Sequence, residues 1–331
     1  ALAWLLDLSP NVVAIPGART PDAARSAARA AQLRLTAPAR EALARSFGRS
    51  RPQRSSAGVG DVVLVMGIPG AGKTKVAAEY ADRGYARLNR DERGGSLREI
   101  AGDLDEELAA GRRRIVLDNT YLTRAARSHV VDAAARHGVR VRCVWLDTPL
   151  AQAQVNLVER LLERFGGLPE PEQLRAHGRR EAGLLLPTSQ MRALRELEPP
   201  ATDEGFAEIE RVAFTRAART GRSGVFVAGA ALEHAGWERT LADPDAPRLV
   251  FDWDPHGVRD ALRGRAAAAA TAVCGHGGGP PICWCRPPLP GLPLAFARAH
   301  DVDPAKSSLV GVSAAHRTLA ATLGAAYVSV A

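Results

Sequence analysis

The chain has 331 residues, of which 46% are hydrophobic and 24% are charged, as in an ordinary globular protein of two or three domains. It carries 44 lysines and arginines against 36 acidic residues, a formal net charge of +8. This mild excess is compatible with a polyanionic partner such as nucleic acid. It does not establish one, because arginine, alanine and glycine are abundant throughout the chain.

Composition argues against several classes of protein. No window reaches the roughly 18 uninterrupted apolar residues of a membrane span, and no signal peptide pattern is present. Four cysteines are too few for a disulfide framework in a chain of this length. We therefore expect no membrane association and a cytoplasmic location. The first residue is not Met, so the chain is compatible with a piece of a longer protein.

The first 47 residues contain a short apolar run, NVVAIPGA, and an Ala/Arg-rich helix pattern that ends near Phe47. The following residues, 48–59, are basic and rich in Ser, Gly and Arg. This composition is typical of a linker. A first small domain over 1–47 is therefore expected to be joined flexibly to the rest of the chain.

Residues 60–200 show alternating strand and helix patterns. Short apolar runs predict strands at 61–66, 85–89, 113–119 and 139–147. Amphipathic patterns predict helices at 73–83, 96–111, 123–137 and 148–164, with one or two more before 198. Such alternation predicts the α/β class, with a parallel sheet that has helices on both faces.

The segment GIPGAGKT (67–74) follows the first predicted strand and matches the pattern Gly-x4-Gly-Lys-Thr. Gly67, Gly70 and Gly72 would let backbone N–H groups surround a phosphate, at the positive N-terminus of the next helix. Lys73 would contact the β- and γ-phosphates, and Thr74 would hold Mg²⁺ through its hydroxyl. ATP and Mg²⁺ are therefore the expected ligands of this loop.

Acidic residues follow two later strands. Asp91 comes after the strand predicted at 85–89, where a small P-loop kinase has a carboxylate that takes a proton from the attacking hydroxyl. The alternative for Asp91 is a solvated acid in a turn. Asp118 and Asn119 end the strand predicted at 113–119, at the sheet edge where α/β proteins bind ligands. The arginines that follow them, Arg124 and Arg127, are candidates for phosphate contacts.

These motifs, LNRDERGGSL, IVLDNTYLTRAAR and CVWLDTPLAQAQVNLVER resemble the kinase domain of polynucleotide 5′-kinase/3′-phosphatases over about residues 60–200. The resemblance implies a P-loop kinase that transfers the γ-phosphate of ATP to 5′-hydroxyl ends of DNA or RNA, as in nucleic-acid repair. It implies catalytic roles for Asp91, Lys73 and Arg160, the last as a lid arginine over the phosphates. On the acceptor side it matches Asp118, Asn119, Thr120 and Arg127, with Arg164 as a further candidate. Tyr121 departs from the family, which usually has Asn at this position.

Two other functions remain open on these residues. One is a P-loop kinase that acts on the hydroxyl of a small molecule. The other is a regulator that binds nucleotide or nucleic acid without catalysis, although the presence of Asp91 and Asp118 argues against it. The oligomeric state is undetermined by the sequence.

Residues 201–331 are predicted to form a second small α/β unit, with strand patterns at 224–232, 249–253, 307–312 and 325–331. Four residues suited to one tetrahedral zinc ion lie close together in a Gly/Pro-rich loop: Cys274, His276, Cys283 and Cys285. The loop has no apolar periodicity, so a bound metal would supply its order. Unrelated cysteines are the alternative.

The segment CWCRPPLPG resembles the zinc loop of haloacid-dehalogenase-type phosphatases, and the likeness extends over about residues 205–331. It implies a Rossmann-like domain whose catalytic positions have been replaced. These positions are held by Ala228, Ala230, Pro287, Val312 and His316. Phosphate transfer through an aspartyl-phosphate requires carboxylates, so no phosphatase activity is expected. A competing interpretation uses Asp252 and Asp254 as the acidic pair, but leaves little chain before the zinc loop.

The N-terminal stretch ALAWLLDLSPNVVAIPGARTPDAARSAARAAQLRLT resembles the last strand and helix of an aldo-keto reductase barrel, where the IPGAR-type segment contributes to NADPH binding. One β/α unit of eight cannot close a barrel. We therefore expect residues 1–47 to be a remnant without reductase activity.

Overall fold

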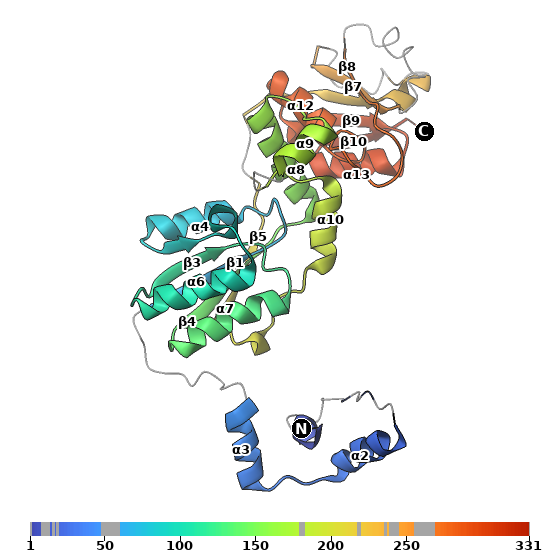
Figure 1. Ribbon diagram of the computed structural model, residues 1–331. Coiled ribbons are helices and arrows are strands. Elements are labelled where there is room, and N and C mark those ends of the chain that lie inside the picture. Colours follow the sequence, from blue (N-terminus) through green and yellow to red (C-terminus); the bar gives the residue numbers. More distant parts are fainter. Residues whose placement is uncertain are drawn as a thin grey trace. The chain divides into compact units, whose positions relative to one another are not determined.

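The computed structural model describes residues 2–7, 14, 17, 20–47, 60–178, 183–216, 220–234, 237, 245–254 and 269–330. The chain divides into two compact units, Ala1–Ser56 and Ala57–Ala331 (Figure 1). Among the described residues, no helix is long and apolar enough to cross a membrane.

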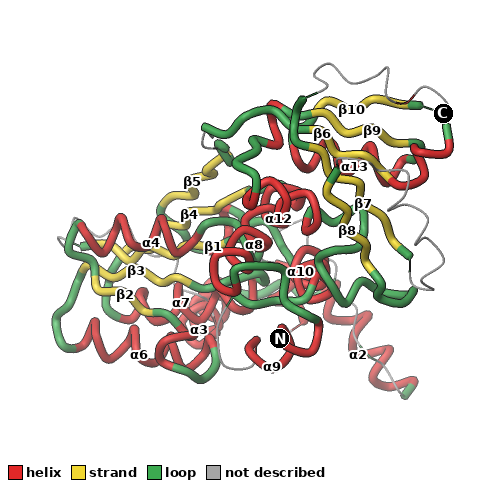
Figure 2. The backbone as a smooth tube through the Cα atoms, turned by 90° about the horizontal axis from the view of Figure 1, so that it is seen from above, coloured by secondary structure: helices red, strands yellow, loops and turns green. Residues whose placement is uncertain are grey.

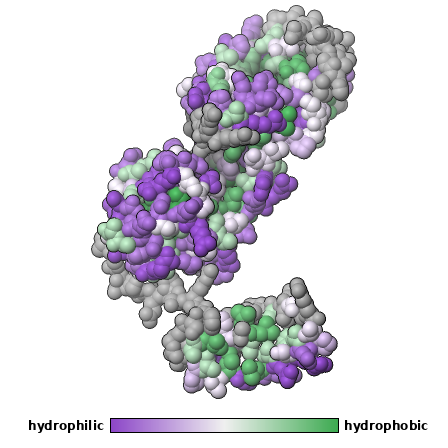
Figure 3. Space-filling model, in the orientation of Figure 1, coloured by the Kyte–Doolittle hydropathy of each residue, from purple (hydrophilic) through white to green (hydrophobic). Residues whose placement is uncertain are grey.

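The first unit consists of helices α1 (Leu2–Asp7), α2 (Pro21–Gln32) and α3 (Ala37–Phe47). Thr20 caps α2, because its hydroxyl accepts a hydrogen bond from the Ala23 N–H at 3.2 Å. None of the residues of α2 is buried, and hydrophobic residues show on the surface of this unit in Figure 3. The linker expected at 48–59 and most of the apolar run NVVAIPGA lie outside the described residues. The reductase-like origin of this unit stays a prediction.

The second unit contains two five-stranded parallel sheets, which confirms the expected α/β class. The first sheet has the order β2-β3-β1-β4-β5. Its strands are β1 (Asp61–Met66), β2 (Ala86–Leu88), β3 (Arg114–Asp118), β4 (Arg140–Asp147) and β5 (Glu208–Ala213). Their carboxyl ends meet at one edge, where the Gly67–Thr74 loop begins.

The sequence patterns did not predict strand β5. Its sequence EIERVA is charged and largely exposed, because β5 lies at the edge of the sheet and packs only partly on the core. It follows the domain boundary expected at residue 200, so the first sheet takes in residues that the sequence assigned to the second domain.

Helices cover both faces of the first sheet. On one face, α6 (Leu97–Ala109) and α7 (Arg124–Arg136) contribute buried residues to a core with β1, β3 and β4. On the other face, α4 (Lys73–Asp82) packs with the alternate residues of β1. The remaining helices before the second sheet are α5 (Arg90–Arg93), α8 (Leu150–Phe165), α9 (Pro171–Gly178), α10 (Pro187–Glu196) and the 3-10 turn η1 (Thr202–Glu204).

The second sheet has the order β10-β9-β6-β7-β8. Its strands are β6 (Val225–Ala228), β7 (Arg248–Trp253), β8 (Ala270–Cys274), β9 (Ser308–Gly311) and β10 (Ala326–Ser329). Described helices around it are α12 (Gly291–Ala299) and α13 (Ala314–Leu323), with the 3-10 turns η2 (Gly229–Glu233) and η4 (Pro304–Lys306). The strand expected at 224–232 ends at Ala228, where η2 begins, and β8 was not predicted.

Helix α8 belongs to the cores of both sheets. Ala153, in its first turns, packs in the core of the first sheet. Val158 and Leu161, further along, pack in the core that contains Phe226 and Phe251 of the second sheet. Figures 1 and 2 both show α8 beside α12, and the two helices are in contact. The two sheets are therefore joined by shared apolar packing as well as by the chain.

Candidate active site and metal centre

The Gly67–Thr74 loop turns directly from β1 into α4, as its motif predicts. Gly70 has a φ of +86°, and a Cβ there would lie 2.3 Å from the carbonyl oxygen of Ala153 in α8, so only glycine fits. Gly72, with a φ of +96°, has nothing within 4 Å of the position of a Cβ. The loop is thus tightly packed against α8 on one side and open at Gly72, a cradle that suits a phosphate group.

Three side chains from later segments hold the carbonyl groups of this loop. The Asn156 amide of α8 donates a hydrogen bond to the Gly70 carbonyl at 2.7 Å, and the Gln190 amide of α10 donates one to Pro69 at 3.0 Å. The Thr148 hydroxyl donates one to Ala71 at 3.1 Å. The sequence motif identified none of these contacts, since they join residues 77 to 121 positions apart.

Lys73 lies at the centre of the charged groups of the site. Its ammonium group donates hydrogen bonds to the carbonyls of Gly67 and Ile68, each at 3.0 Å. Burial lowers the pKa of Lys73 to about 8, with a smaller lowering by the charge of Arg160, while Asp118 and Asp91 act in the opposite direction. The charges of Asp91, Asp118 and Arg160, three residues that the sequence singled out, therefore all act on Lys73. Thr74 is exposed at the start of α4.

Asp118 is buried and tied to the second strand. Its Oδ2 accepts hydrogen bonds from Arg87 at 2.5 Å and from Asn89 at 3.2 Å. The Asn89 side chain also caps α5, because its Oδ1 accepts from the Asp91 N–H at 2.7 Å. Arg87 and Asn89 were missed by sequence reasoning, although Asn directly before a helix is a recognised cap signal. The Asn89 cap fixes the backbone of the exposed Asp91.

The residues that follow Asp118 at the carboxyl edge of the sheet contact the Gly67–Thr74 loop and the start of α5. The Thr120 carbonyl accepts a hydrogen bond from the Gly67 N–H at 3.3 Å. The Asn119 side chain accepts one from the Arg90 N–H at 2.9 Å and donates one to the Tyr121 hydroxyl at 3.2 Å. Tyr121 is fully buried with a φ of +43°. Tyr121, the departure from the family pattern, is therefore an interior residue that positions Asn119.

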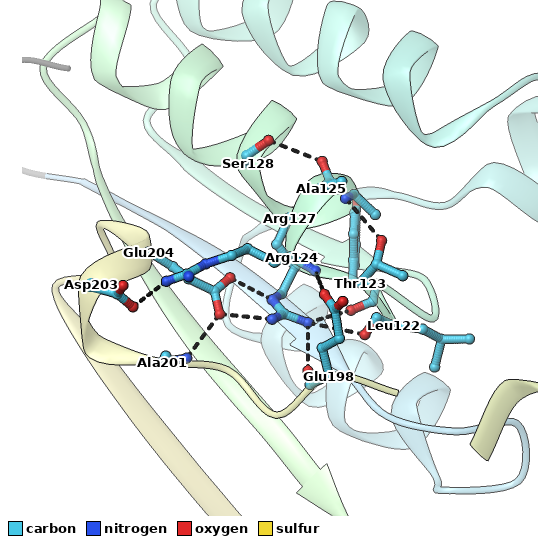
Figure 4. A network of polar contacts seen from close by, with 12 residues as sticks. Leu122, Thr123, Arg124, Ala125, Arg127, Ser128, Glu198, Ala201, Asp203 and Glu204 are labelled. Carbon is cyan, nitrogen blue, oxygen red and sulfur yellow. Dashed lines mark hydrogen bonds and ion pairs between the residues drawn. The ribbon is translucent and has the colours of Figure 1, made fainter. Parts of the chain in front are cut away.

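Arg127 does not serve as the phosphate-binding arginine that the sequence suggested. Its side chain is fully buried, and its guanidinium forms a bidentate ion pair with Glu204 at 2.7 Å (Figure 4). The same group donates hydrogen bonds to the carbonyls of Tyr121, Leu122 and Glu198. Its donors are therefore used to join α7 to η1, and the neighbouring Arg124 is paired with Asp203.

The lid arginines lie on α8. Arg160 is exposed, and its charge acts on Lys73. Arg164 lies one turn further along the helix, exposed at its last turn, with its guanidinium 5.9 Å from the Phe165 ring centre. Of the two arginines, Arg160 is the one whose charge acts on Lys73 of the loop.

The four predicted metal ligands come together in one cluster. The ligand atoms of Cys274, His276, Cys283 and Cys285 all lie within 4.8 Å of one another. A tetrahedral zinc ion with Zn–S bonds of about 2.3 Å requires ligand separations of about 3.8 Å, so the cluster can surround one ion. Three thiols and one imidazole also suit the chemistry of zinc.

Arg286 closes the loop around this cluster. Its guanidinium donates hydrogen bonds to the carbonyls of Gly277 at 3.1 Å and Gly279 at 2.6 Å. It also lies 5.3 Å from the ring centre of Trp253, whose indole N–H donates to the His276 carbonyl at 2.8 Å. These contacts bring the two halves of the metal loop together at the end of β7.

The expected phosphatase positions lie at the carboxyl edge of the second sheet. Ala228 ends the central strand β6, and Ala230 follows it in η2. Val312 follows β9, and its N–H donates a hydrogen bond to Nδ1 of His316 at 3.2 Å. Burial lowers the pKa of His316. Asp252, from the competing interpretation, lies on β7, which is next to the central strand β6. Ala228, at the first expected position, lies on the central strand itself.

Comparisons with known proteins bear on the first sheet. Residues 62–180 match the AAA domain family. The chain is 24% identical over 156 residues to the bifunctional polynucleotide phosphatase/kinase of Schizosaccharomyces pombe, an alignment that covers 46% of this chain and 34% of that protein. This chain therefore spans about a third of the length of that relative.

Two solved structures show likeness at low identity. Kti12 from Chaetomium thermophilum, in complex with ADP-AlF3, is 13% identical, with a TM-score of 0.35, over 46% of this chain and 89% of that one. The Mycobacterium tuberculosis APS kinase CysC, in complex with AMPPNP and APS, is 20% identical, with a TM-score of 0.30, over 48% and 90%.

The match over 62–180, the loop and the strand order define the first sheet as a P-loop domain of the kinase type. Such a domain supports phosphotransfer from ATP with Mg²⁺. The similarity to the phosphatase/kinase supports the kinase family that the motifs suggested.

The pKa of Lys73 predicts how nucleotide binding depends on pH. A bound polyphosphate raises the pKa of this lysine above its free value of about 8, so binding is strongest below pH 8. Above pH 8 the free protein loses the proton, and affinity for ATP should fall by up to about tenfold per pH unit. Titration with a fluorescent ATP analogue from pH 7 to 10 measures the slope. The Lys73→Arg variant keeps its charge and should bind with a flatter profile; an equal slope in both proteins contradicts this assignment.

The buried pair of Arg127 and Glu204 predicts a large effect on stability. Glu204→Gln leaves the guanidinium without its anion and should lower the free energy of unfolding by about 3 kcal/mol, as measured by urea denaturation. The control Asp203→Asn removes the exposed partner of Arg124 and should change it by less than about 0.5 kcal/mol. Equal stability of Glu204→Gln and the parent protein would refute the structural role of Arg127.

Proposed function

We propose that the chain is an ATP-dependent kinase that phosphorylates 5′-hydroxyl ends of DNA or RNA. The observation that carries the proposal is the arrangement around Lys73. One exposed carboxylate (Asp91), one buried carboxylate (Asp118) and one lid arginine (Arg160) all lie close enough to act on its charge. A general base, a phosphate-binding lysine and a second cation around one phosphate cradle are the parts that phosphoryl transfer requires.

In the proposed reaction, Asp91 accepts the proton of the 5′-hydroxyl as its oxygen attacks the γ-phosphorus of ATP. The bond between the γ-phosphorus and the β–γ bridging oxygen breaks, and ADP leaves. Lys73 and Arg160 stabilise the negative charge on the transferring group. Asp91 is suited to this task because Asn89 fixes its backbone, while its side chain, paired with Arg90 at 3.3 Å, stays 45% exposed to an incoming hydroxyl.

Magnesium would be held by the Thr74 hydroxyl together with the phosphates, and it would neutralise part of their charge. The residues fit such an ion, because Thr74 is exposed in the first turn of α4, next to the open position at Gly72.

The nature of the acceptor rests on the polynucleotide phosphatase/kinase relative and on the motifs at Asp91 and Asp118–Thr120. We further propose that Asn119 and Thr120 lie on the acceptor side, with Arg164 as a peripheral cation. Arg127 is left out of this set, because its donors are used in the interior.

For the second sheet we propose a haloacid-dehalogenase-type domain that binds a structural zinc ion and lacks phosphatase activity. The donor set of Cys274, His276, Cys283 and Cys285 supports the zinc. The loss of activity follows from Ala228 at the end of the central strand, where that chemistry needs a carboxylate nucleophile.

The acceptor can be identified with labelled ATP. The full chain is incubated with 5′-hydroxyl oligonucleotides of DNA and RNA, and in parallel with a panel of sugars and nucleosides. Label on the oligonucleotide ends supports the proposal. Label on a sugar or nucleoside alone establishes a small-molecule kinase instead, and ATP binding without any transfer establishes a nucleotide-binding regulator.

The role of Asp91 can be tested by replacing its carboxylate with an amide. Asp91→Asn removes the proton acceptor with little change in shape, so the turnover rate should fall about 100-fold or more while ATP affinity stays unchanged. Steady-state kinetics and titration with an ATP analogue separate the two effects. Asp103→Asn, an acid-to-amide change on α6, serves as control and should keep the parent rate. An Asp91→Asn protein with the parent rate would overturn the assignment.

A further inference from the structure

Helices α8, α9 and α10 lie between the metal cluster and the Gly67–Thr74 loop in the network of contacts. Helices α8 and α10 carry Arg160 and the two amides that hold the loop, and α8 and α9 also pack in the core of the second sheet. Among the described residues, these three helices and the residues directly before α9 and α10 therefore connect the two sites.

On the metal side, the first contact is made by Glu170, which precedes α9. Nδ1 of His276 lies 3.2 Å from the Cys285 sulfur and 3.5 Å from the Cys274 sulfur, so Nδ1 is the nitrogen that faces the cluster. Nε2 of the same ring lies 3.1 Å from Oε2 of Glu170. A histidine that binds a metal through one nitrogen usually donates its other N–H to a carboxylate, which orients the ring and increases its basicity.

The second contact comes from Trp284, which stands between two of the cysteines. Its side chain is 3% exposed, in the core that contains Leu174 and Leu184. Its indole N–H donates a hydrogen bond to the Leu185 carbonyl at 2.8 Å, just before α10 begins at Pro187. The metal loop thus holds the start of the helix from which Gln190 reaches Pro69.

On the nucleotide side, α8 and α10 hold the loop from two directions. Asn156 and Gln190 donate to consecutive carbonyls, those of Gly70 and Pro69. The backbone of Ala153 lies directly against Gly70. A shift of either helix would therefore move the phosphate cradle, because the contacts are short and made to backbone groups.

We infer that the metal cluster positions the nucleotide-binding loop. Glu170 acts as the carboxylate partner of the His276 ligand, and Trp284 transmits the order of the metal loop through α10 to Pro69. This inference rests on the proposed metal site and is independent of the acceptor. It gives a domain without phosphatase residues a function, which is to support the kinase site.

The first experiment measures nucleotide affinity in the full chain with and without metal. The protein is stripped with a chelator, and binding of a fluorescent ATP analogue is compared before stripping, after it and after addition of Zn²⁺. We expect stripped protein that keeps its helical circular dichroism to bind about tenfold more weakly, with recovery on addition of Zn²⁺. Stripped, folded protein with the parent affinity would overturn the inference, as would protein that never binds a stoichiometric metal.

Two variants test the Glu170 contact and the Trp284 contact separately, without removing a metal ligand. Glu170→Gln should weaken Zn²⁺ about tenfold in competition with a chelating dye, while Glu172→Gln, an exposed acid on α9 paired only with Arg175 in the described contacts, should not. Trp284→Phe keeps an aromatic ring but loses the N–H. It should retain one equivalent of Zn²⁺ yet bind the ATP analogue about 2- to 10-fold more weakly.

Hydrogen exchange in Trp284→Phe gives a readout that a general loss of stability would not produce. Faster exchange confined to the start of α10 and to the Gly67–Thr74 loop supports transmission along this path. Unchanged exchange there, or unchanged nucleotide affinity with Zn²⁺ bound, refutes the role of Trp284; equal Zn²⁺ affinity of Glu170→Gln and Glu172→Gln refutes that of Glu170.

Discussion

The Gly67–Thr74 loop turns sharply from β1 into α4, and its carbonyl groups must find hydrogen-bond partners inside the protein. A buried carbonyl without a hydrogen bond is costly, so this constraint governs the surroundings of the loop. Thr148, Asn156 and Gln190 satisfy it. Because these side chains come from the residue after β4 and from α8 and α10, those segments must be in place for the loop to keep its shape.

The same requirement explains the position of α8. Helix α8 has to hold Gly70 and, in the proposed reaction, also to present Arg160 to the transferring phosphate. Its apolar residues anchor it in both cores: Ala153 packs in the core of the first sheet, and Leu161 packs in that of the second. The second sheet provides a surface on which this helix is anchored by apolar packing.

Buried ion pairs form the surroundings of the loop on its β3 side. Asp118 is paired with Arg87, and Arg127 with Glu204, so neither of these interior groups faces solvent. A paired, buried carboxylate supplies a fixed negative charge that acts on Lys73, and in the proposed reaction proton transfer falls to the exposed Asp91. Sequence patterns predicted Asp91 and Asp118 as neighbours of the loop, but the difference in their environments becomes visible only when Arg87 and Asn89 are seen around Asp118.

Local patterns were sufficient for the α/β class, four strands of the first sheet, the Gly67–Thr74 turn and the grouping of Cys274, His276, Cys283 and Cys285, because each depends on residues close together in the sequence. They failed for β5, a charged edge strand, and for Arg127, whose partner Glu204 lies 77 positions later. The sequence by itself therefore determined which chemical groups are available. Only the tertiary structure decided which of them face substrate and which are used inside, because pairing and burial depend on segments that meet through folding.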